Sequence, residues 1–463
     1  IYWPQRVVMV CVRLAACRSR ALPRLRGHRH SVAGFCSNQR VGTQSRCGAA
    51  LLNVEPELIY AGKSTFEVAL SWVMLWTCAQ PWLLGPGMQV LRRATSSWWG
   101  WPVNAIVRRL VFPHYCAGEN LGACHRVAAV LKRSGGVELV VDHSQEEREA
   151  PEDWARNLES KINLLQSMRQ ELGGRARFMP FKATSVMSPI LLERMAALIM
   201  QDEHWCKEIV DPTPSLKRDE LLLLQEAEAN LSALCTAAQN CGIALWLDAE
   251  QSHRQPAIDW LARRLMHCFN IPGRPPVIFN TYQLYLVGAD SRVMRDLQDG
   301  KAHGYCFAAK CVRGAYLTAE KKRATDCGTS SPLHESKSAT DAAFDRTVAA
   351  VLERIVAGCD ASLAICTHNA VSTAAAVDQM AKLGIPRDSP RIHFAQILGM
   401  CDHLTGSLGT LGYRAHKLVL FGVYEEVFPW LLRRLDENRD MLGACQTERP
   451  LLSREIRRRL FLS

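Results

Sequence analysis

Eight short runs of apolar and β-branched residues recur along the chain from residue 137 onward, and longer amphipathic stretches separate them. The runs cover residues 137–141, 177–181, 243–247, 277–279, 305–309, 362–366, 391–394 and 416–420. Continuous apolar runs of this length are typical of strands buried on both faces, as in a parallel sheet. Strands that alternate with helices favour a parallel α/β fold, and eight such units predict a closed, TIM-like (β/α)8 barrel.

Local signals between the runs support this alternation. Ser188-Pro189 places a capping residue and a first-turn proline ahead of a helix over 190–200. A helix over 370–383 ends at Gly384-Ile385-Pro386, which is a C-terminal stop signal. The alternative fold is an open doubly wound sheet, which carries a glycine-rich turn after its first strand. Because no Gly-x-Gly-x-x-Gly motif occurs in the chain, we predict the closed barrel.

The chain ahead of the barrel divides into two segments of different composition. Residues 1–54 contain nine arginines and no acidic residue, and they include serines and short apolar runs. This composition is typical of a mitochondrial transit peptide, while a disordered basic tail or a wrongly assigned first exon is the alternative. Residues 55–135 are predicted to form a helical N-terminal arm. The barrel is expected over residues 136–463.

Charge and ligand patterns exclude several classes of function. The formal net charge is +11, but nine of these charges lie in residues 1–54, which leaves 11 − 9 = +2 for the rest. A nucleic-acid partner therefore has little electrostatic support. Cysteines and histidines do not cluster with the spacing of metal ligands, so no metal site is predicted. The most apolar stretch, 66–84, contains Glu67, Gln80 and Pro81 and is not a clean membrane span.

Polar residues follow the predicted strands at the point where each strand ends. In a (β/α)8 barrel these ends lie together on one face, where the active site is built. The closing residues are Asp142, His143, Lys182, Asp248, Glu250, Asn280, Gln283, Lys310, Arg313, Tyr316, Thr367, His368, Asn369 and Gln396, and the eighth strand leads into Arg433 and Arg434. Any one of them alone is more typical of a helix cap. Together they predict a polar pocket with excess positive charge, suited to a carboxylate substrate, a phosphorylated cofactor, or both.

The adjacent arginines Arg433 and Arg434 are the most specific part of this pattern. Neighbouring residues on a helix diverge by about 100°, so two guanidinium groups can hold one small anion from two sides. Glu437 lies three and four residues further on, on the same helix face. The alternative is a solvated helix surface with a single ion pair.

Several of these segments together resemble the proline dehydrogenase family. They are 246–251 (Trp-Leu-Asp-Ala-Glu-Gln), 277–283 (Val-Ile-Phe-Asn-Thr-Tyr-Gln), 311–317 (Cys-Val-Arg-Gly-Ala-Tyr-Leu), 367–369 (Thr-His-Asn), 396–403 (Gln-Ile-Leu-Gly-Met-Cys-Asp-His) and 431–438 (Leu-Leu-Arg-Arg-x-x-Glu-Asn). The resemblance implies a distorted (β/α)8 barrel with non-covalently bound FAD. It also implies a mitochondrial enzyme that oxidises L-proline to Δ1-pyrroline-5-carboxylate and passes electrons to ubiquinone at the matrix face of the inner membrane, with peripheral membrane association.

The resemblance also assigns expected roles to the strand-end residues. Expected at the cofactor are Asn280, Gln283, Lys310, Arg313, Ala315, Thr367, His368, Gln396 and Glu437. Expected at the substrate are Arg433, Arg434 and Lys182 around the carboxylate, with Asp248, Tyr316, Leu398, Leu418 and Trp430 lining the pocket. Positive charge near a flavin stabilises its reduced form, which agrees with the predicted excess of cations.

The chain departs from the family pattern at two positions. Trp430 stands where the family usually has tyrosine. The segment His416-Lys417-Leu418 replaces Tyr-Lys-Tyr of the proline enzymes and Tyr-Lys-Ser of the hydroxyproline enzymes. Leu418 therefore matches neither branch, and trans-4-hydroxy-L-proline remains an alternative substrate. A catalytically degenerate, flavin-binding paralogue is the alternative from a different class. The remaining motifs favour proline.

Overall fold

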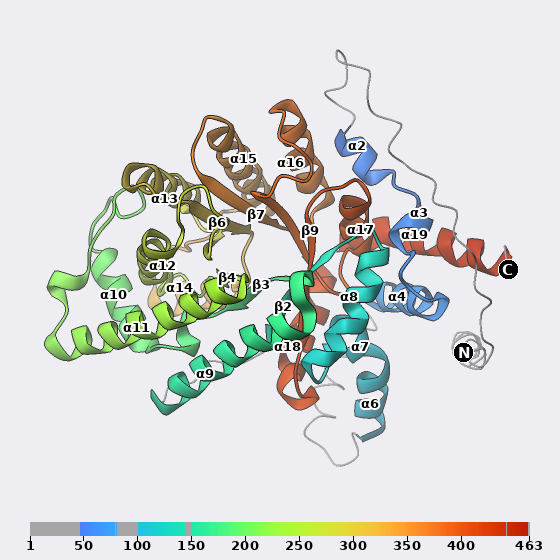
Figure 1. The fold of residues 1–463 in the computed structure, drawn as a ribbon, viewed down its shortest axis with the longest axis horizontal. Coiled ribbons are helices and arrows are strands. Elements are labelled where there is room, and N and C mark those ends of the chain that lie inside the picture. Colours follow the sequence, from blue (N-terminus) through green and yellow to red (C-terminus); the bar gives the residue numbers. More distant parts are fainter. Residues whose placement is uncertain (1–46, 79, 81–100, 144–150, 441, 462–463) are drawn as a thin grey trace.

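Eight parallel strands close into a barrel in the computed structural model, with helices packed around its outside (Figure 1). The structure describes residues 47–78, 80, 101–143, 151–440 and 442–461, and the side chains of 78, 151–152, 433–440 and 442–446 lie outside that description. Strand order runs from β2 to β9 in sequence, and β9 pairs with both β8 and β2 to close the sheet. The predicted barrel is therefore confirmed.

Each predicted run coincides with one barrel strand. The barrel strands are β2 (Glu138–His143), β3 (Ala176–Phe181), β4 (Ala244–Leu247), β5 (Ile278–Gln283), β6 (Phe307–Val312), β7 (Ala361–Cys366), β8 (Ile392–Ile397) and β9 (Ala415–Phe421). The helices of the barrel are α9 (Pro151–Ser167), α10 (Pro189–Ile199), α11 (Arg218–Cys241), α12 (Gln255–Phe269), α13 (Ala289–His303), α14 (Leu317–Cys327), α15 (Lys337–Val356), α16 (Ala370–Lys382), α17 (Asp402–Thr410) and α18 (Tyr424–Asp440). The remaining elements are α2 (Cys47–Leu52), α3 (Pro56–Ile59), α4 (Thr65–Cys78), α6 (Trp101–Ile106), α7 (Phe112–Tyr115), β1 (Cys116–Gly118), α8 (Cys124–Arg133) and α19 (Leu442–Phe461).

The predicted helix signals act as expected. The hydroxyl of Ser188 accepts a hydrogen bond from Leu191 N at 3.3 Å, which caps α10 ahead of Pro189. The Asn369 side chain accepts from Val371 N at 2.9 Å and caps α16 in the same way. At the other end of α16, Gly384 adopts a φ of 69° and the chain turns away.

Aromatic side chains fill the interior of the barrel below the strand ends. Phe178 stacks on Trp246 with a centroid separation of 4.6 Å and meets Phe279 edge-on at 5.7 Å. We call these three residues the aromatic floor. Small residues from β6, β7 and β8 oppose it: Ala308, Ala364 and Ala395. Because side chains close the interior at this level, any ligand has to bind above the floor, at the carboxyl ends of the strands.

Two histidines lie beside the aromatic floor. His393 Nδ1 and His416 Nε2 are 3.0 Å apart, and both rings pack edge-on against Phe178. Burial lowers the pKa of His393 to about 3 and lowers the pKa of His416 well below its usual range. Both imidazoles are therefore neutral near pH 7, so the interior below the mouth carries no charge from them.

A short strand outside the barrel extends the edge of β9. Strand β1 runs parallel to β9, with Cys116 opposite Leu420 and Gly118 opposite Phe421. Strand β2 occupies one edge of β9 over its whole length, while β8 pairs with it only as far as Leu418. Strand β1 therefore takes the part of that second edge that β8 leaves open. The sequence predicted a mostly helical arm here, since three residues are too few to give a strand pattern.

A buried ionic cluster fixes β9 to the arm. The Lys417 ammonium, 1% exposed, donates to Met400 O at 2.7 Å and lies 2.8 Å from Asp402 Oδ1. On the other side of Asp402, the Lys63 ammonium reaches Oδ2 at 2.5 Å. Burial alone would raise the pKa of Asp402, but the two ammonium groups outweigh it and hold the pKa well below its usual range. Asp402 is therefore the ionised centre of a Lys–Asp–Lys bridge.

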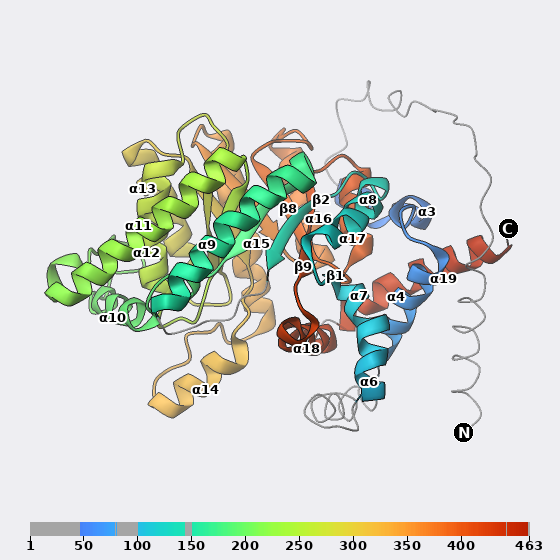
Figure 2. The same ribbon diagram turned by 60° about the horizontal axis from the view of Figure 1, so that its bottom comes forward.

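The last helix joins the same region. Helix α19 lies along α4, where Trp72 Nε1 donates to Ser453 Oγ at 2.9 Å (Figures 1 and 2). Glu448 of α19 accepts from Tyr60 Oη at 3.3 Å and from His403 N at 3.1 Å. Both ends of the described chain thus pack on the side of the barrel next to β9. Among the described helices, none has the length and apolar content needed to cross a membrane.

Helix α2 lies within the segment that we predicted to be a basic leader. Its Leu51 is buried, and Gly48 N donates to Asp378 Oδ1 of α16 at 2.8 Å. Residues from 47 onward therefore form part of the folded structure. The first 46 residues, which contain all nine arginines of the predicted leader, are outside the described part of the chain.

We predict that Asp402→Ala destabilises the protein by about 3–5 kcal/mol at pH 7, because it leaves two buried ammonium groups without their common partner. The folded-state pKa of Asp402 is depressed, so its contribution is present above the unfolded-state pKa of about 3.9 and is lost as the pH falls below it. Urea unfolding at pH 7 and in mild acid measures this. The exposed Asp326→Ala serves as the control, and equal stabilities of the two variants at pH 7 would contradict the prediction.

Candidate active site

Lys310 and Asp248 form an ion pair at the mouth of the barrel, by which we mean the carboxyl ends of its strands. The Lys310 ammonium donates to Asp248 Oδ1 at 2.6 Å and lies 5.0 Å from the centroid of the Trp246 ring. Burial alone would lower the pKa of Lys310, but the Asp248 carboxylate outweighs it and the pKa is raised. Lys310 therefore stays positively charged above the aromatic floor.

A second carboxylate enters the mouth from β2. Side chains alternate along a strand, and Val140 packs in the barrel interior, so Asp142 points to the same side two residues later. Burial and the nearby Asp248 raise the pKa of Asp142 to about 7, against the opposing effect of Lys161, Lys310 and Lys182. The mouth thus holds two acids and three lysines from five different elements.

Lys161 is the member of this group that the sequence analysis missed. It lies on α9, only 7% exposed, and burial lowers its pKa to about 8. A signal was present in the sequence: the buried stripe of α9 runs through Trp154, Asn157, Lys161, Leu165 and Met168 at helical spacing. A lysine in the middle of such a stripe is unusual unless it has a partner or a function. Asp142 was recognised as a strand end but given no role.

Gln283 ties four of the mouth loops together. Its amide nitrogen donates to Glu250 O at 2.7 Å, and its amide oxygen accepts from Ala315 N at 3.2 Å. The carboxylate of Glu250 in turn accepts from Thr184 N and Oγ1, both at 3.1 Å. These bonds link the segments that follow β3, β4, β5 and β6. Gln283 and Ala315 therefore hold the loops in register with one another.

Gly314 is required by the close approach of an aromatic ring. Its φ is +153°, and a Cβ at this position would lie 2.4 Å from the ring of Tyr285. The turn places Tyr316, which is half-buried, directly ahead of α14 at the mouth. Helix α14 and helix α18, which follow β6 and β9, lie at the same end of the barrel in Figure 2.

Arg313 points from β6 toward the helices α15 and α16. Its guanidinium donates to Asp341 Oδ1 at 2.6 Å, to Thr367 Oγ1 at 2.5 Å and to Ser372 Oγ at 2.8 Å. The same group lies 4.5 Å above the ring of Phe344. Arg313 is thus held rigidly by three acceptors, with its charge balanced by Asp341.

The polar chain continues from Thr367 to the end of β8. Gln396 Nε2 donates to Thr367 O at 3.1 Å, and Gln396 Oε1 accepts from Thr405 Oγ1 at 2.8 Å. Next to it, Ile397 N donates to His368 Nε2 at 3.0 Å, which places the ring proton of His368 on Nδ1 in the neutral tautomer. The structure therefore brings Arg313, Thr367, His368 and Gln396 into one network.

Asn280 differs from the other predicted site residues because it faces the helices. It is fully buried, and its amide nitrogen donates to Asp259 Oδ1 of α12 at 2.9 Å. Asp259 also pairs with Arg292 of α13. The side chain of Asn280 lies behind β5, on the opposite side from Thr281 and Lys310. Asn280 therefore anchors β5 to the surrounding helices.

Of the predicted site residues from Leu398 onward, the structure describes only some of the side chains. Leu418 packs against the interior cluster that contains the aromatic floor, and its carbonyl accepts from Leu398 N at 3.0 Å. Trp430 is buried in a separate apolar cluster with Phe112 and Tyr115. The side chains of Arg433, Arg434 and Glu437 lie outside the described residues, although their backbone belongs to α18. Lys182 follows β3 directly and is half-buried.

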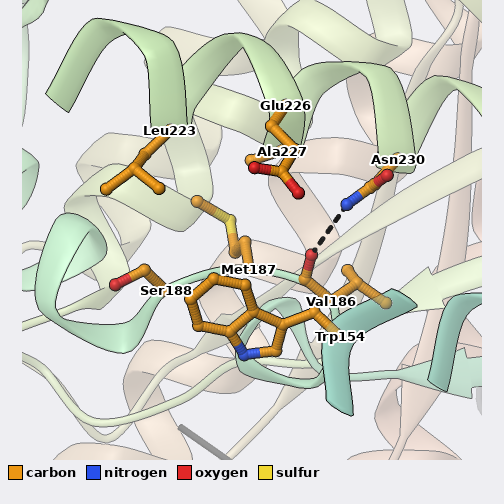
Figure 3. Close-up of a pocket in the computed structure, with 8 residues that line it drawn as sticks. All are labelled: Trp154, Val186, Met187, Ser188, Leu223, Glu226, Ala227 and Asn230. Atoms are coloured by element: carbon orange, nitrogen blue, oxygen red, sulfur yellow. Dashed lines mark hydrogen bonds between the residues drawn. The ribbon is translucent and has the colours of Figure 1, made fainter. Parts of the chain in front are cut away.

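Two further features lie away from this network. Figure 3 shows a small hollow between α9 and α11, where Asn230 Nδ2 donates to Val186 O at 3.4 Å. Its lining contains none of the predicted site residues. No group of three or more His, Cys, Asp or Glu residues with metal-site geometry occurs within the part of the chain that the structure describes.

Comparison with known proteins gives the chain a family. The sequence profile described as Proline dehydrogenase matches residues 124–447, a range that contains all eight barrel strands. Human mitochondrial proline dehydrogenase 1 is 37% identical over 242 residues, which is 52% of this chain and 40% of the human protein. Rat hydroxyproline dehydrogenase is 30% identical over 421 residues, 86% of this chain and 92% of the rat protein.

Solved structures agree at the level of the fold. Proline utilization A from Bdellovibrio bacteriovorus superposes with a TM-score of 0.63 at 16% sequence identity, covering 86% of this chain. The match spans 41% of that protein, so this chain corresponds to less than half of it. Since the family profile covers well over half of the chain, the chain belongs to the proline dehydrogenase family.

Proposed function

We propose that the protein is an FAD-dependent dehydrogenase that oxidises L-proline to Δ1-pyrroline-5-carboxylate. The observation that carries this proposal is the Lys310–Asp248 pair above the aromatic floor, inside a barrel whose whole length matches the family. The mouth combines a buried cation with an aromatic floor beneath it. This combination suits an aromatic cofactor that gains negative charge on reduction. We propose FAD as this cofactor, and membership of the proline dehydrogenase family supports that choice.

The residues at the mouth fit a flavin. Trp246 Nε1 and Thr281 Oγ1 are buried and have no hydrogen-bond partner, and Thr281 lies opposite Lys310 in the strand register. Unpaired buried polar groups of this kind are costly unless a ligand satisfies them. When bound, FAD supplies the ring that accepts a hydride. In this proposal Lys310 and Arg313 supply positive charge, Gln283 and Ala315 fix the loops, and Thr367, His368, Gln396 and Glu437 hold the remainder of the cofactor. Asn280 supports the site from behind β5.

The substrate is proposed to bind on the side of Lys182 and α18. Lys182 has no hydrogen bond or ion pair from its ammonium among the described residues, which leaves it available for a carboxylate. Arg433 and Arg434 complete that carboxylate site in the proposal. Asp248, Tyr316, Leu398, Leu418 and Trp430 line the ring end. The apolar Leu418 next to the aromatic floor favours an unsubstituted pyrrolidine ring.

The cellular setting is likewise a proposal. Relatives named as mitochondrial proline dehydrogenases in human and fruit fly support a mitochondrial location. We propose that electrons leave to ubiquinone at the matrix face of the inner membrane, with the protein peripherally associated. This proposal follows from the family resemblance.

Oxidation of trans-4-hydroxy-L-proline is the second candidate. It is favoured by the extent of the matches: hydroxyproline dehydrogenases of frog and rat align over 86–87% of this chain and about nine-tenths of their own length. The human proline dehydrogenase aligns over about half of the chain, but at a higher identity of 37%. The two substrates differ by one hydroxyl group, so the environment of Leu418 is the most direct discriminator.

A spectroscopic titration tests the proposed function. The purified protein is expected to show the visible absorbance of oxidised flavin, and anaerobic addition of L-proline is expected to bleach it. Arg433→Ala and Arg434→Ala should keep the flavin but need far more proline, since removing one partner of a buried charge pair costs about 2–5 kcal/mol. A colourless protein, or a flavin that neither proline nor hydroxyproline bleaches, would support the degenerate paralogue instead.

Lys310→Met is predicted to act on the cofactor. Loss of the ammonium removes positive charge beside the ring, so flavin retention should weaken or the flavin reduction potential should fall. The measurement is flavin content together with the potential from a dye-linked titration. Lys301→Met, which removes an exposed lysine of α13, is the matched control. A normal flavin content and a normal potential in Lys310→Met would assign Lys310 to barrel stability alone.

Leu418→Ser is predicted to change substrate preference. In the unmodified protein a 4-hydroxyl buried against Leu418 is unpaired, which costs about 1–3 kcal/mol. Hydroxyproline should therefore be the poorer substrate by roughly 10-fold to 100-fold in kcat/KM. The serine variant should narrow this gap by supplying a hydrogen-bond partner and space. Steady-state kinetics with both substrates measure it, and equal or better turnover of hydroxyproline by the unmodified protein would identify the second candidate as the true function.

A further inference from the structure

Three charged groups at the mouth have no hydrogen-bond or ion-pair partner among the described residues. The side chains of Asp142, Lys161 and Lys182 make no hydrogen bond and no ion pair within 4 Å among the described residues. The other cations of the site are different, because Lys310 is bonded to Asp248 and Arg313 to Asp341. Lys182 is accounted for by the substrate carboxylate. Asp142 and Lys161 are not accounted for by any contact described so far.

Lys161 is held in place by its helix rather than by a partner. Its neighbour on the same stripe, Asn157, donates to Ser185 O at 3.0 Å and so fixes α9 to the loop that follows β3. Lys161 lines a hollow together with His143, the residue after Asp142, and Pro180. An unpaired buried ammonium is unfavourable for folding. The burial of Lys161 is therefore better explained by a role in the chemistry at the mouth than by a contribution to folding stability.

The proposed reaction requires a group at the mouth that accepts a proton. The ring nitrogen of proline carries an extra proton at neutral pH, and a hydride leaves the adjacent carbon only after that nitrogen has recovered its lone pair. One proton must therefore be accepted at the mouth. Lys310 is charged and donates to Asp248, so neither member of that pair is a ready acceptor. Asp142 is the carboxylate of the mouth that has no bonded partner.

We propose that Asp142 accepts the proton that the substrate ammonium loses, and that Lys161 is a positioning residue that keeps the Asp142 carboxylate ionised until the substrate binds. In this step one N–H bond of the substrate breaks and one O–H bond forms on Asp142, and no electrons are transferred. The proton then passes to water, because Asp142 and His143 are both partly exposed. The inference rests on the proposed function.

The electrostatics of the mouth agree with this assignment. The charges that act on Asp142 are those of Asp248 after β4, Lys182 after β3, Lys310 on β6 and Lys161 on α9. Burial and Asp248 favour its protonated form, and Lys161 is the strongest of the groups that oppose them. The pKa of Asp142, raised to about 7, means that the carboxylate is ionised above that pH and protonated below it. Flavin reduction by proline should therefore slow as the pH falls through about 7.

Two variants separate the roles of the pair. In Asp142→Asn we expect flavin reduction at neutral pH to fall by roughly 100-fold or more, since general-base catalysis contributes about that much. The remaining rate should rise steadily with pH, because the amine then loses its proton to solvent. Lys161→Met keeps the acceptor but removes the charge that holds it ionised, so the midpoint of the pH profile should move to higher pH. Asp142→Glu should restore the wild-type shape of the profile.

Readouts that do not depend on turnover exclude a structural role. Tetrahydrofuran-2-carboxylate has the same ring and carboxylate but no N–H, so all variants should bind it as tightly as the wild type does in calorimetry. Lys161→Met should also raise the melting temperature, because it removes a buried ammonium group from the folded state. Arg156→Met, which removes an exposed cation from the same helix, is the control and should leave the pH profile unchanged.

The outcomes that overturn the proposal are distinct from failure of the proposed function. A wild-type pH profile in Asp142→Asn, or an unmoved midpoint in Lys161→Met, would overturn it. If both variants lost affinity for the oxygen analogue by the same factor as for proline, Asp142 and Lys161 would have only a structural role. If the wild-type flavin is not bleached by proline or hydroxyproline at any pH, the proposed function itself fails before these comparisons begin.

Discussion

Closure of the barrel through β9 is the constraint on which the rest of the structure depends. This strand pairs with β8 and β2 to complete the barrel and with β1 to anchor the arm. Its Lys417 forms one side of the buried bridge to Asp402 and Lys63, and the chain continues from its end into α18. The helix that carries the arginine pair therefore takes its position from β9. Any shift of this strand would move α18 relative to Lys310 and Asp248.

The charged side chains at the mouth fall into two sets. One set is bonded to an oppositely charged partner, and the other has no such bond among the described residues. Lys310 and Arg313 are each bonded to an acid and so are fixed in place, with their fields partly balanced. Asp142, Lys161 and Lys182 lie near enough to interact electrostatically with one another, but they form no bond to any side chain that the structure describes. The aromatic floor and the two neutral histidines below keep the surroundings poor in polar groups. In such surroundings unpaired charges interact strongly with a zwitterionic ligand, because little else screens them.

Much of the fold could be predicted because buried parallel strands leave an uninterrupted apolar signal. All eight runs were found for this reason, and the polar residue after each run marked the mouth. The side on which a strand-end residue points was harder to predict. Asn280, Thr281, Tyr282 and Gln283 are all polar, so no apolar alternation shows which of them faces inward. Strand β1 is too short to show a pattern. Lys161 lies in the apolar stripe of its helix, but that stripe does not show which acidic residues it lies near in the fold.

The contacts that join the arm to α19 link residues far apart in the chain. Lys63 and Asp402 are separated by 339 positions, Tyr60 and Glu448 by 388, and Arg459 bonds to Tyr60 O across 399. No local sequence pattern could have predicted them. They also impose an order on biosynthesis: the arm leaves the ribosome first, but its partners are among the last residues made. For most of translation, Tyr60, Val68 and Leu75 have no apolar surface to pack against. A chain of this design therefore depends on protection of its amino-terminal part until its carboxyl end has been synthesised.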